Sequence, residues 1–167
     1  MTFILESARL RFRESTPGDA KHMFALNSDP EVVQYTGDGP FASIQEARDF
    51  LENYVQVFRR FQRGRWLLEL KSTGEVIGWC GLKFHEDNSE TDVGYRLFKK
   101  HWGNGYATEA AKAAIAYGFD TLQLDRIVAH ARKENIASLK VLEKCGMKII
   151  GEDNDCDGEI FVWEILR

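Results

Sequence analysis

Two glycines separated by one residue, Gly103 and Gly105, stand at the head of the alanine-rich, helix-spaced stretch "YATEAAKAAIAYGF" (106–119). The N-terminus of a helix leaves backbone N–H groups unpaired and carries partial positive charge, so it stabilises phosphate oxygens. Glycine has no Cβ, which lets those N–H groups approach an anion closely. The pattern therefore predicts a cradle for a diphosphate, although a glycine pair that only permits a tight turn fits the same letters.

Two familiar phosphate-binding loops are excluded by the residues present. A dinucleotide fingerprint needs a third glycine where Thr108 stands, and the chain contains no Gly-Lys-Ser/Thr of a P-loop. The segments before the glycines also have the spacing of an antiparallel meander, whereas the dinucleotide fold needs a parallel βαβ unit.

Changes in hydrophobic periodicity indicate the elements that position the glycine loop. Thr16-Pro17 starts a helix, Asp29-Pro30 interrupts it, and Ser43 with Glu46 has the form of a capping box for the next helix. The expected strands are 8–14, 65–71, 76–84, 91–98, 126–132, 147–152 and 159–166, and the expected helices are 17–28, 43–63, 106–119 and 135–146. We expect a single α+β domain over residues 1–167, with a mixed central sheet of about seven strands flanked by about four helices.

Composition and charge limit the classes of function. The chain has 167 residues, 44% of them hydrophobic, and a formal net charge of −4, which gives no general attraction to nucleic acid or to an anionic membrane. Its three cysteines, Cys80, Cys145 and Cys156, lack the spacing of a zinc site or a disulfide framework, so we expect free thiols in a reducing, cytoplasmic compartment. No apolar run reaches the ~18 residues of a membrane helix, and the N-terminal segment lacks the pattern of a signal peptide.

Two segments carry a resemblance to a known family. "GYRLFKKHWGNGYATEA" (94–110) resembles the signature loop of the GNAT acetyltransferase superfamily, and "ENIASLKVLEKCGM" (134–147) is similar to its second signature. The form with Trp102 before the glycines and Glu109 after them closely resembles the RimJ/RimL-like branch, the ribosomal-protein N-terminal acetyltransferases. The resemblance implies the single-domain acyl-CoA N-acyltransferase fold and acetyl-CoA as co-substrate, with no metal.

The resemblance also implies where acetyl-CoA binds. The cleft would open between the strand at 91–98 and the strand at 126–132. The residues implied are backbone at Leu97, Phe98 and Lys99 for the pantetheine arm, N–H groups at Gly103, Asn104, Gly105, Tyr106, Ala107 and Thr108 for the pyrophosphate, and Asn135 and Ser138 at the thioester end.

Three positions depart from the family pattern. Lys100 replaces the preferred Arg or Gln and offers charge without a planar fork, and Met147 replaces a phenylalanine. Leu142 stands where many members have a tyrosine general acid. The branch implies Ser138 as the substitute donor, although a serine in the first turn of a helix capped by Asn135 can also simply satisfy backbone.

A base must assist deprotonation of the attacking amine. Asp92 occupies the place where the branch commonly carries an acidic residue, and strand alternation sets Glu90, Asp92 and Arg96 on one face. We therefore expect Asp92 as the base, with Glu90 or solvent as alternatives. Asp92 as a surface residue paired with Arg96 is nearly as plausible from the sequence.

The function implied is transfer of an acetyl group from acetyl-CoA to a primary amine, most simply the α-amine of a ribosomal or other protein N-terminus. Two alternatives stay open: a small-molecule amine such as an antibiotic or polyamine, and an acyl-CoA-binding module without turnover. Phe41, Trp79 and Tyr35 are candidates to line an acceptor pocket. No nucleic-acid or membrane partner is expected, and both a monomer and a homodimer fit the sequence.

Overall fold

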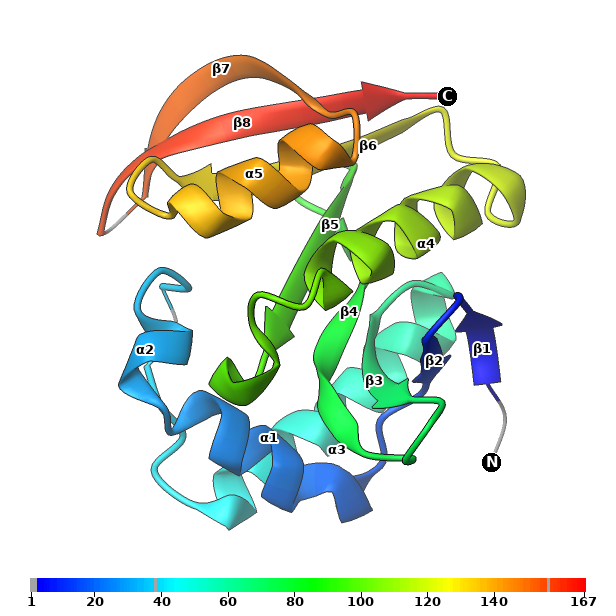
Figure 1. The fold of residues 1–167 in the computed structure, drawn as a ribbon, viewed down its shortest axis with the longest axis vertical. Coiled ribbons are helices and arrows are strands. Elements are labelled where there is room, and N and C mark those ends of the chain that lie inside the picture. Colours follow the sequence, from blue (N-terminus) through cyan, green and yellow to red (C-terminus); the bar gives the residue numbers. More distant parts are fainter. Residues whose placement is uncertain (1–2, 38, 156) are drawn as a thin grey trace.

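The computed structural model describes residues 3–37, 39–155 and 157–167 (Figure 1). Cys156, one of the three expected free thiols, lies outside the described residues, whereas Cys80 and Cys145 are free. The strands are β1 (Phe3–Glu6), β2 (Leu10–Arg13), β3 (Arg65–Leu70), β4 (Val76–His85), β5 (Glu90–Leu97), β6 (Arg126–Arg132), β7 (Lys148–Asp155) and β8 (Gly158–Leu166). The α-helices are α1 (Ala20–Asn27), α2 (Pro30–Val33), α3 (Ile44–Phe61), α4 (Tyr106–Asp120) and α5 (Ile136–Lys144).

The strands form one sheet in the order β1-β2-β3-β4-β5-β6-β8-β7. Neighbouring strands are antiparallel except β5 and β6, which are parallel, so the predicted mixed sheet is confirmed. β5 pairs with β4 from Glu90 to Leu97, but it pairs with β6 only where Asp92 faces Val128. The two parallel strands therefore separate toward the end of β5, and this separation makes room for the site.

The element counts differ from the expected seven strands and four helices. The described residues form eight strands and five α-helices. The sequence "FILE" of β1 was not predicted as a strand because it is short and lacks apolar–polar alternation. The additional helix is α2, which starts where the sequence predicted only an interruption, because Asp29 caps it by accepting from the Glu31 N–H and Pro30 fits its first position.

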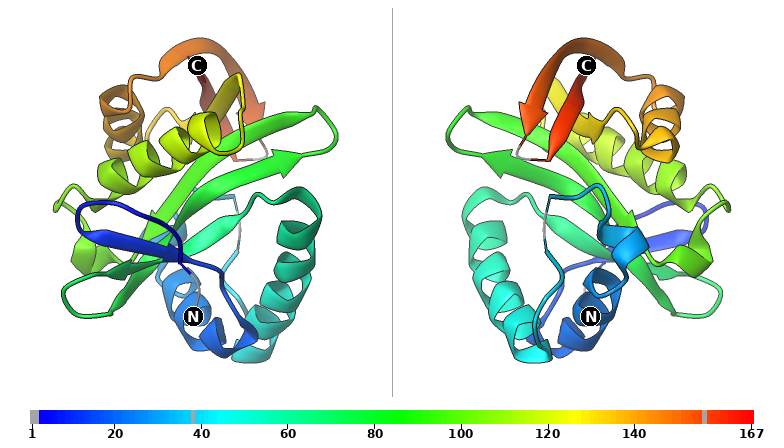
Figure 2. Two further views of the ribbon diagram at one scale, coloured as in Figure 1. Left: turned by 90° about the vertical axis from the view of Figure 1, so that its right-hand side faces the viewer. Right: turned by 90° about the vertical axis from the view of Figure 1, so that its left-hand side faces the viewer.

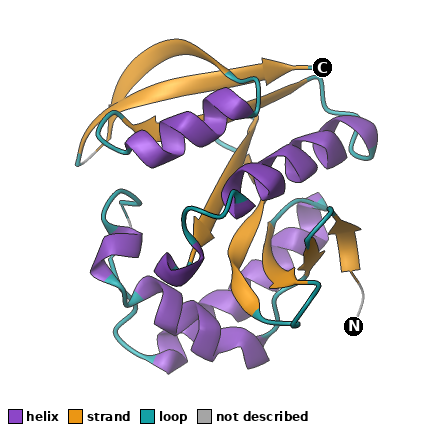
Figure 3. Ribbon diagram, in the orientation of Figure 1, coloured by secondary structure: helices purple, strands orange, loops and turns teal. Residues whose placement is uncertain are grey.

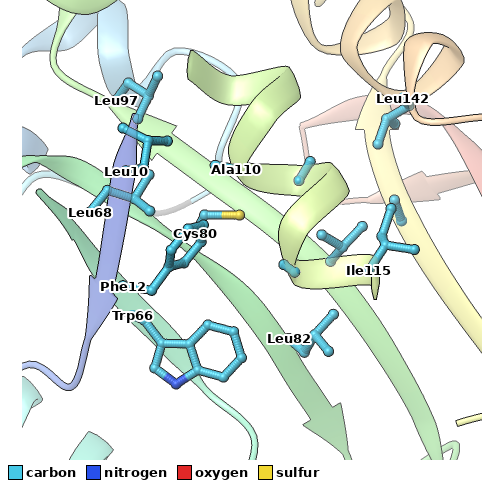
Figure 4. Close-up of a cluster of buried hydrophobic side chains, with 14 of the residues drawn as sticks. Leu10, Phe12, Trp66, Leu68, Cys80, Leu82, Leu97, Ala110, Ile115 and Leu142 are labelled. Atoms are coloured by element: carbon cyan, nitrogen blue, oxygen red, sulfur yellow. The ribbon is translucent and has the colours of Figure 1, made fainter. Parts of the chain in front are cut away.

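Helices cover both faces of the sheet. Figure 2 shows α4 and α5 on one side and α1 and α3 on the other, and Figure 3 shows the same layers by secondary structure. The buried cluster of Figure 4 lies between α4 and the strands, with Ala110, Ala111 and Ala114 of the helix fully buried. Small side chains on this helix face let the helix lie close to β4 and β5, and so fix the position of its N-terminus.

Helix caps agree with the sequence pattern. The Ser43 hydroxyl accepts from the Glu46 N–H at the start of α3, and Gly146 ends α5 with a φ of 81°. In the described part of the chain, no helix combines the length and apolar character needed to cross a membrane.

Candidate active site

A cavity of about 440 Å³ lies between the end of β5, the start of α4 and the first turns of α5. Its lining includes eight of the residues predicted to bind the cofactor, namely Leu97, Gly103, Gly105, Tyr106, Ala107, Thr108, Asn135 and Ser138. Phe98, Lys99 and Asn104 are not among the described residues that line it. The Phe98 N–H instead donates to the Ile77 carbonyl (3.0 Å), and the Lys99 ammonium contacts Glu31 (2.6 Å). We refer to this space as the cofactor cavity.

The two glycines form the turn into α4. Gly103 and Gly105 each have a φ of +76°, and Gly105 is the N-cap of the helix. A Cβ at Gly103 would meet no atom within 4 Å, and one at Gly105 would meet only the Arg9 Nη2 at 3.6 Å. The left-handed backbone therefore favours glycine at both positions, while the space beside them is open to a ligand. The tight-turn and cradle interpretations are compatible in this loop.

The N-terminus of α4 offers the donors that a pyrophosphate needs. The first N–H groups of a helix have no acceptor within the helix, and those of Tyr106, Ala107 and Thr108 belong to residues that line the cofactor cavity. Asn104 contributes differently, because its Nδ2 donates to the carbonyls of His101 and Trp102 and so stiffens the turn.

Arg9 holds the glycine loop from outside the cavity. Its Nε donates to Glu109 Oε2 (2.6 Å), its Nη1 donates to the Asn104 carbonyl (3.1 Å), and its guanidinium lies 4.4 Å from the centre of the Tyr106 ring. Glu109 also accepts from the Ser7 hydroxyl (2.7 Å). Burial raises the pKa of Glu109, but the hydrogen bonds from Ser7 and Arg9 outweigh it and lower the pKa. This support of the glycine loop by the β1–β2 connection was not predicted from the sequence.

Lys100, at the family's Arg or Gln position, makes an ion pair with Glu75 in the strand connection between β3 and β4. Two-thirds of its side chain is exposed, and it is not among the described residues lining the cofactor cavity. Its charge is therefore directed away from the cavity in this structure.

Ser138 and Tyr95, which both line the cofactor cavity, contact each other. The Ser138 Oγ lies 2.8 Å from the Tyr95 Oη, and the Tyr95 hydroxyl is also 3.2 Å from the Ser138 carbonyl oxygen. Asn135 caps α5 by accepting from the Ser138 N–H (3.2 Å), as predicted. Burial raises the pKa of Tyr95, so its phenol stays protonated. Tyr95 was not predicted as a site residue from the sequence. Alternation along β5 places its side chain on the opposite face of the strand from that of Arg96.

Asp92 is held by two side chains, the guanidinium of Arg65 and the imidazole of His85. Its two carboxylate oxygens lie 3.0 and 2.9 Å from the Arg65 Nη2, and its Oδ1 lies 3.1 Å from the His85 Nε2. Burial alone raises the pKa of Asp92, but Arg65 and His85 outweigh it and hold the pKa well below its usual range. The pairing with Arg96 weighed from the sequence is wrong, because Arg96 lies against Asn27 instead.

Glu90 is also engaged in polar contacts. Its Oε1 accepts from the Arg126 Nη1 (2.6 Å) and its Oε2 from the Asn88 Nδ2 (3.0 Å). Neither Glu90 nor Asp92 is among the described residues that line the cofactor cavity or the cavity described next. Their assignment as bases stays a prediction.

A second cavity, of about 350 Å³, lies on the α1 and α3 side of the sheet. Phe41 and Trp79 line it, whereas Tyr35 lines the cofactor cavity. The rings of Phe41, Phe50 and Tyr54 follow one another at centroid distances of 5.5 and 5.6 Å. We refer to this space as the aromatic cavity. It is lined by Ser15, Met23, Asn27, Gly39, Phe41, Phe50, Leu51, Tyr54, Arg65, Leu67, Trp79 and Arg96.

Arg96 is shared by the two cavities. It is a lining residue of both, and it follows Tyr95 directly in β5. The two cavities therefore adjoin the same end of β5. Among the described residues, no cluster of His, Cys, Asp and Glu side chains has the arrangement of a metal site.

Comparisons with known proteins agree with this geometry. The family model for the acetyltransferase (GNAT) domain matches residues 9–148. The chain is 37% identical over 139 residues to the uncharacterized N-acetyltransferase p20 of Bacillus licheniformis, covering 83% of this chain and 78% of that protein. It is 26% identical over 137 residues to the spermidine N(1)-acetyltransferase of Escherichia coli (strain K12), covering 80% and 70% of the two chains.

A solved structure has the same fold. RimL, a ribosomal L7/L12 alpha-N-protein acetyltransferase in complex with coenzyme A, aligns with a TM-score of 0.86 and 17% identity over 99% of this chain and 98% of that chain. The fold is that of the GNAT acetyltransferases, which use acetyl-CoA. The chain belongs to the GNAT acetyltransferase family and is an N-acetyltransferase of that family.

Proposed function

We propose that the protein acetylates a primary amine, with the α-amine of a protein N-terminus as the first candidate acceptor, of the type that RimL-like enzymes modify. The observation that carries this proposal is that Arg96 in β5 lines both cavities, so that a cofactor space and a second space adjoin the same strand. The cofactor cavity has the features for acetyl-CoA, and the aromatic cavity is the space for the acceptor. The likeness to RimL supports the branch, and two free thiols, Cys80 and Cys145, support a reducing compartment such as the cytoplasm.

Acetyl-CoA supplies the acetyl group as a thioester, and the protein supplies position and proton transfer. N–H groups at the start of α4 hold the pyrophosphate, with Gly103 and Gly105 allowing close approach. The acceptor amine, held in the aromatic cavity, reaches the carbonyl carbon beside Arg96. Ser138 stands at this junction as the proton donor to the departing sulfur. Proximity of the two reactants supplies a large part of the rate.

Three groups are candidates for the base that accepts the proton of the amine. Asp92 is the first, with Glu90 and solvent as alternatives. The low pKa of Asp92 makes it a weak proton acceptor, and its oxygens already accept from Arg65 and His85. These contacts favour a path in which a neutral amine enters and its surplus proton leaves through a hydroxyl or water.

The walls of the aromatic cavity distinguish between acceptors. Phe41, Phe50 and Tyr54 offer apolar ring surface, and the Trp79 ring has the guanidiniums of Arg65 and Arg96 at 5.3 and 5.2 Å from its centre. That ring is already engaged by two cations, so it has little to offer the ammonium groups of a polyamine. The cavity supports an amine attached to one apolar or aromatic group, which includes a first residue of a peptide and a compact small molecule.

An acceptor panel tests the proposal. Released CoA is measured for peptides with free N-terminal Phe, Leu, Ser or Ala, for the same peptides with blocked N-termini, for aromatic small-molecule amines and for spermidine. Amine-dependent CoA release with peptides, lost when the N-terminus is blocked, supports the first candidate. Turnover of small-molecule amines without turnover of any peptide supports a small-molecule acceptor instead. Binding of acetyl-CoA without release for any amine contradicts both and indicates a binding module.

A further inference from the structure

We propose that Tyr95 is a positioning residue for the acetyl transfer, and that its phenol hydroxyl fixes the Ser138 hydroxyl where the cofactor and aromatic cavities meet. The inference rests on the proposed function. It assigns a role to a residue of β5 that precedes the glycine loop and lines the cofactor cavity.

The contact joins two elements that enclose the cofactor cavity. Tyr95 comes from β5 and Ser138 from the first turn of α5, 43 residues later. The distance of 2.8 Å between Oη and Oγ is that of an ordinary O–H···O hydrogen bond. Leu142, at the position where the family pattern has a tyrosine, is 1% exposed and has no proton to give. The phenol at this end of the cavity therefore arrives from the neighbouring strand instead of from α5.

The two hydroxyls can be arranged in two ways. When the Tyr95 hydroxyl donates to the Ser138 carbonyl, the Ser138 proton can be engaged by the Tyr95 oxygen. When the Tyr95 hydroxyl donates to the Ser138 Oγ, the Ser138 proton is available to point into the cavity. Burial favours the protonated phenol, so Tyr95 acts by holding and orienting Ser138 and does not itself lose its proton.

The protons of the reaction balance in this arrangement. The amine nitrogen forms a bond to the acetyl carbon, and the carbon–sulfur bond breaks with its electron pair on sulfur. Ser138 gives its hydroxyl proton to the sulfur and takes the surplus proton of the nitrogen, directly or through one water. The serine ends unchanged, the products are an amide and a thiol, and no further reactant is needed.

Kinetics of four variants test whether Tyr95 acts through Ser138. Tyr95→Phe keeps the ring that packs against the buried cluster and removes only the hydroxyl. We expect kcat to fall about 10-fold, with the KM for acetyl-CoA within about twofold and the thermal midpoint nearly unchanged. Ser138→Ala lowers kcat at least as much, and the double variant is no slower than Ser138→Ala alone, because the two hydroxyls act as a unit. Tyr117→Phe, a hydroxyl deletion on α4 beside Trp66, is the control and keeps the wild-type rate.

An unchanged kcat in Tyr95→Phe contradicts the inference. The inference is also contradicted if Tyr95→Phe lowers kcat by the same factor in the wild type and in Ser138→Ala. That result would show that the Tyr95 hydroxyl acts independently of Ser138.

A second measurement needs no acceptor. The thiol of CoA bound to the protein is titrated by the ultraviolet absorbance of its thiolate in the wild type, Tyr95→Phe, Ser138→Ala and Tyr117→Phe. A hydroxyl directed at sulfur stabilises the thiolate, so we expect the bound thiol to titrate about one pH unit lower in the wild type and in Tyr117→Phe than in the other two. Identical titrations in all four proteins overturn the inference. Failure of the wild type to bind CoA contradicts the proposed function itself, so the two failures are distinguishable.

Discussion

Arg9 and Glu109 join the connection between the first two strands to the first turn of α4, with the Arg9 Nε 2.6 Å from the Glu109 Oε2. A carboxylate in the first turn stabilises a helix through the macrodipole, but here it also stands close to the cradle for a phosphate. Arg9 neutralises that carboxylate and holds the Asn104 carbonyl, so the glycine loop keeps both its shape and its attraction for an anion.

Replacing Arg9 should therefore weaken acetyl-CoA binding. We expect Arg9→Met to raise the Kd by about threefold to tenfold, which is the size of effect that a half-exposed ion pair with an added hydrogen bond can have. Calorimetric titration with acetyl-CoA measures it. Arg11→Met is the matched control, because Arg11 lies in the adjacent strand, is similarly exposed and pairs with Glu6 away from the cavity. Equal Kd values for the two variants would show that the contact does not shape the cradle.

Gly105 should contribute to the affinity for acetyl-CoA in addition to forming the turn into α4. A Cβ in the left-handed region costs about 1–2 kcal/mol of stability, so Gly105→Ala lowers the free energy of unfolding by that amount. Gly74→Ala has the same cost, because Gly74 has a φ of 73° and open space around it in the turn between β3 and β4. We expect only Gly105→Ala to weaken acetyl-CoA binding, by about 10-fold or more, since its methyl group stands at the N-terminus of α4. Equal affinity of the two variants for acetyl-CoA would show that Gly105 is needed only for the turn.

The Arg65–Asp92 pair should stabilise the fold. Removing the Asp92 charge leaves a buried guanidinium without its carboxylate, so Asp92→Asn should lower the free energy of unfolding by about 3 kcal/mol or more. Because the pKa of Asp92 is lowered on folding, this stabilisation is complete above the ordinary pKa of an aspartate, ~3.9, and is lost as the pH falls below it. Urea unfolding of wild type and variant between pH 7 and pH 3 should show the difference shrinking as the pH drops. A constant difference would contradict the pairing.

The same variant tests Asp92 as a base. If the carboxylate accepts the amine proton, the rate lost in Asp92→Asn recovers as the pH rises toward the pKa of the acceptor amine. If Asp92 is structural, the pH profile of the folded variant has the wild-type shape, and deprotonation passes to Glu90 or solvent.

The aromatic cavity should bind the acceptor and not the cofactor. Phe50 is 42% exposed and stacks between Phe41 and Tyr54, so Phe50→Ala should have a small effect on stability but raise the acceptor KM several-fold. The KM for acetyl-CoA should stay unchanged in the same variant. Phe61→Ala is the control, because Phe61 lies on the same helix and contacts Phe84 outside both cavities. An acceptor KM in Phe50→Ala that equals that of the wild type would place the acceptor elsewhere.

The sequence predicted those parts of the site that depend on local backbone chemistry. The positive φ of Gly146 at the end of α5 and the cap by Asn135 follow from residue types and spacing that act within one element. The place of the cleft, beside the parallel strands β5 and β6, was implied by the family resemblance and not by the residues alone. The partners of Asp92 could not be predicted, because Arg65 and His85 reach it from other strands and any of several cations could have done so.

Tyr95 was missed for a related reason. A half-buried tyrosine in a strand has core packing as its ordinary role, and only the fold shows that its hydroxyl reaches the first turn of α5. The support of the glycine loop by Arg9 likewise depends on β1 and its turn, which the apolar run at the start of the chain did not reveal.

A crystal structure of the protein with CoA tests the central claim most directly. We predict that the pyrophosphate accepts hydrogen bonds from N–H groups between Gly103 and Thr108, and that the sulfur lies within about 4 Å of the Ser138 Oγ, facing Arg96 and the aromatic cavity. CoA bound with its phosphates away from the start of α4, or with its sulfur directed away from the junction of the two cavities, would contradict the account.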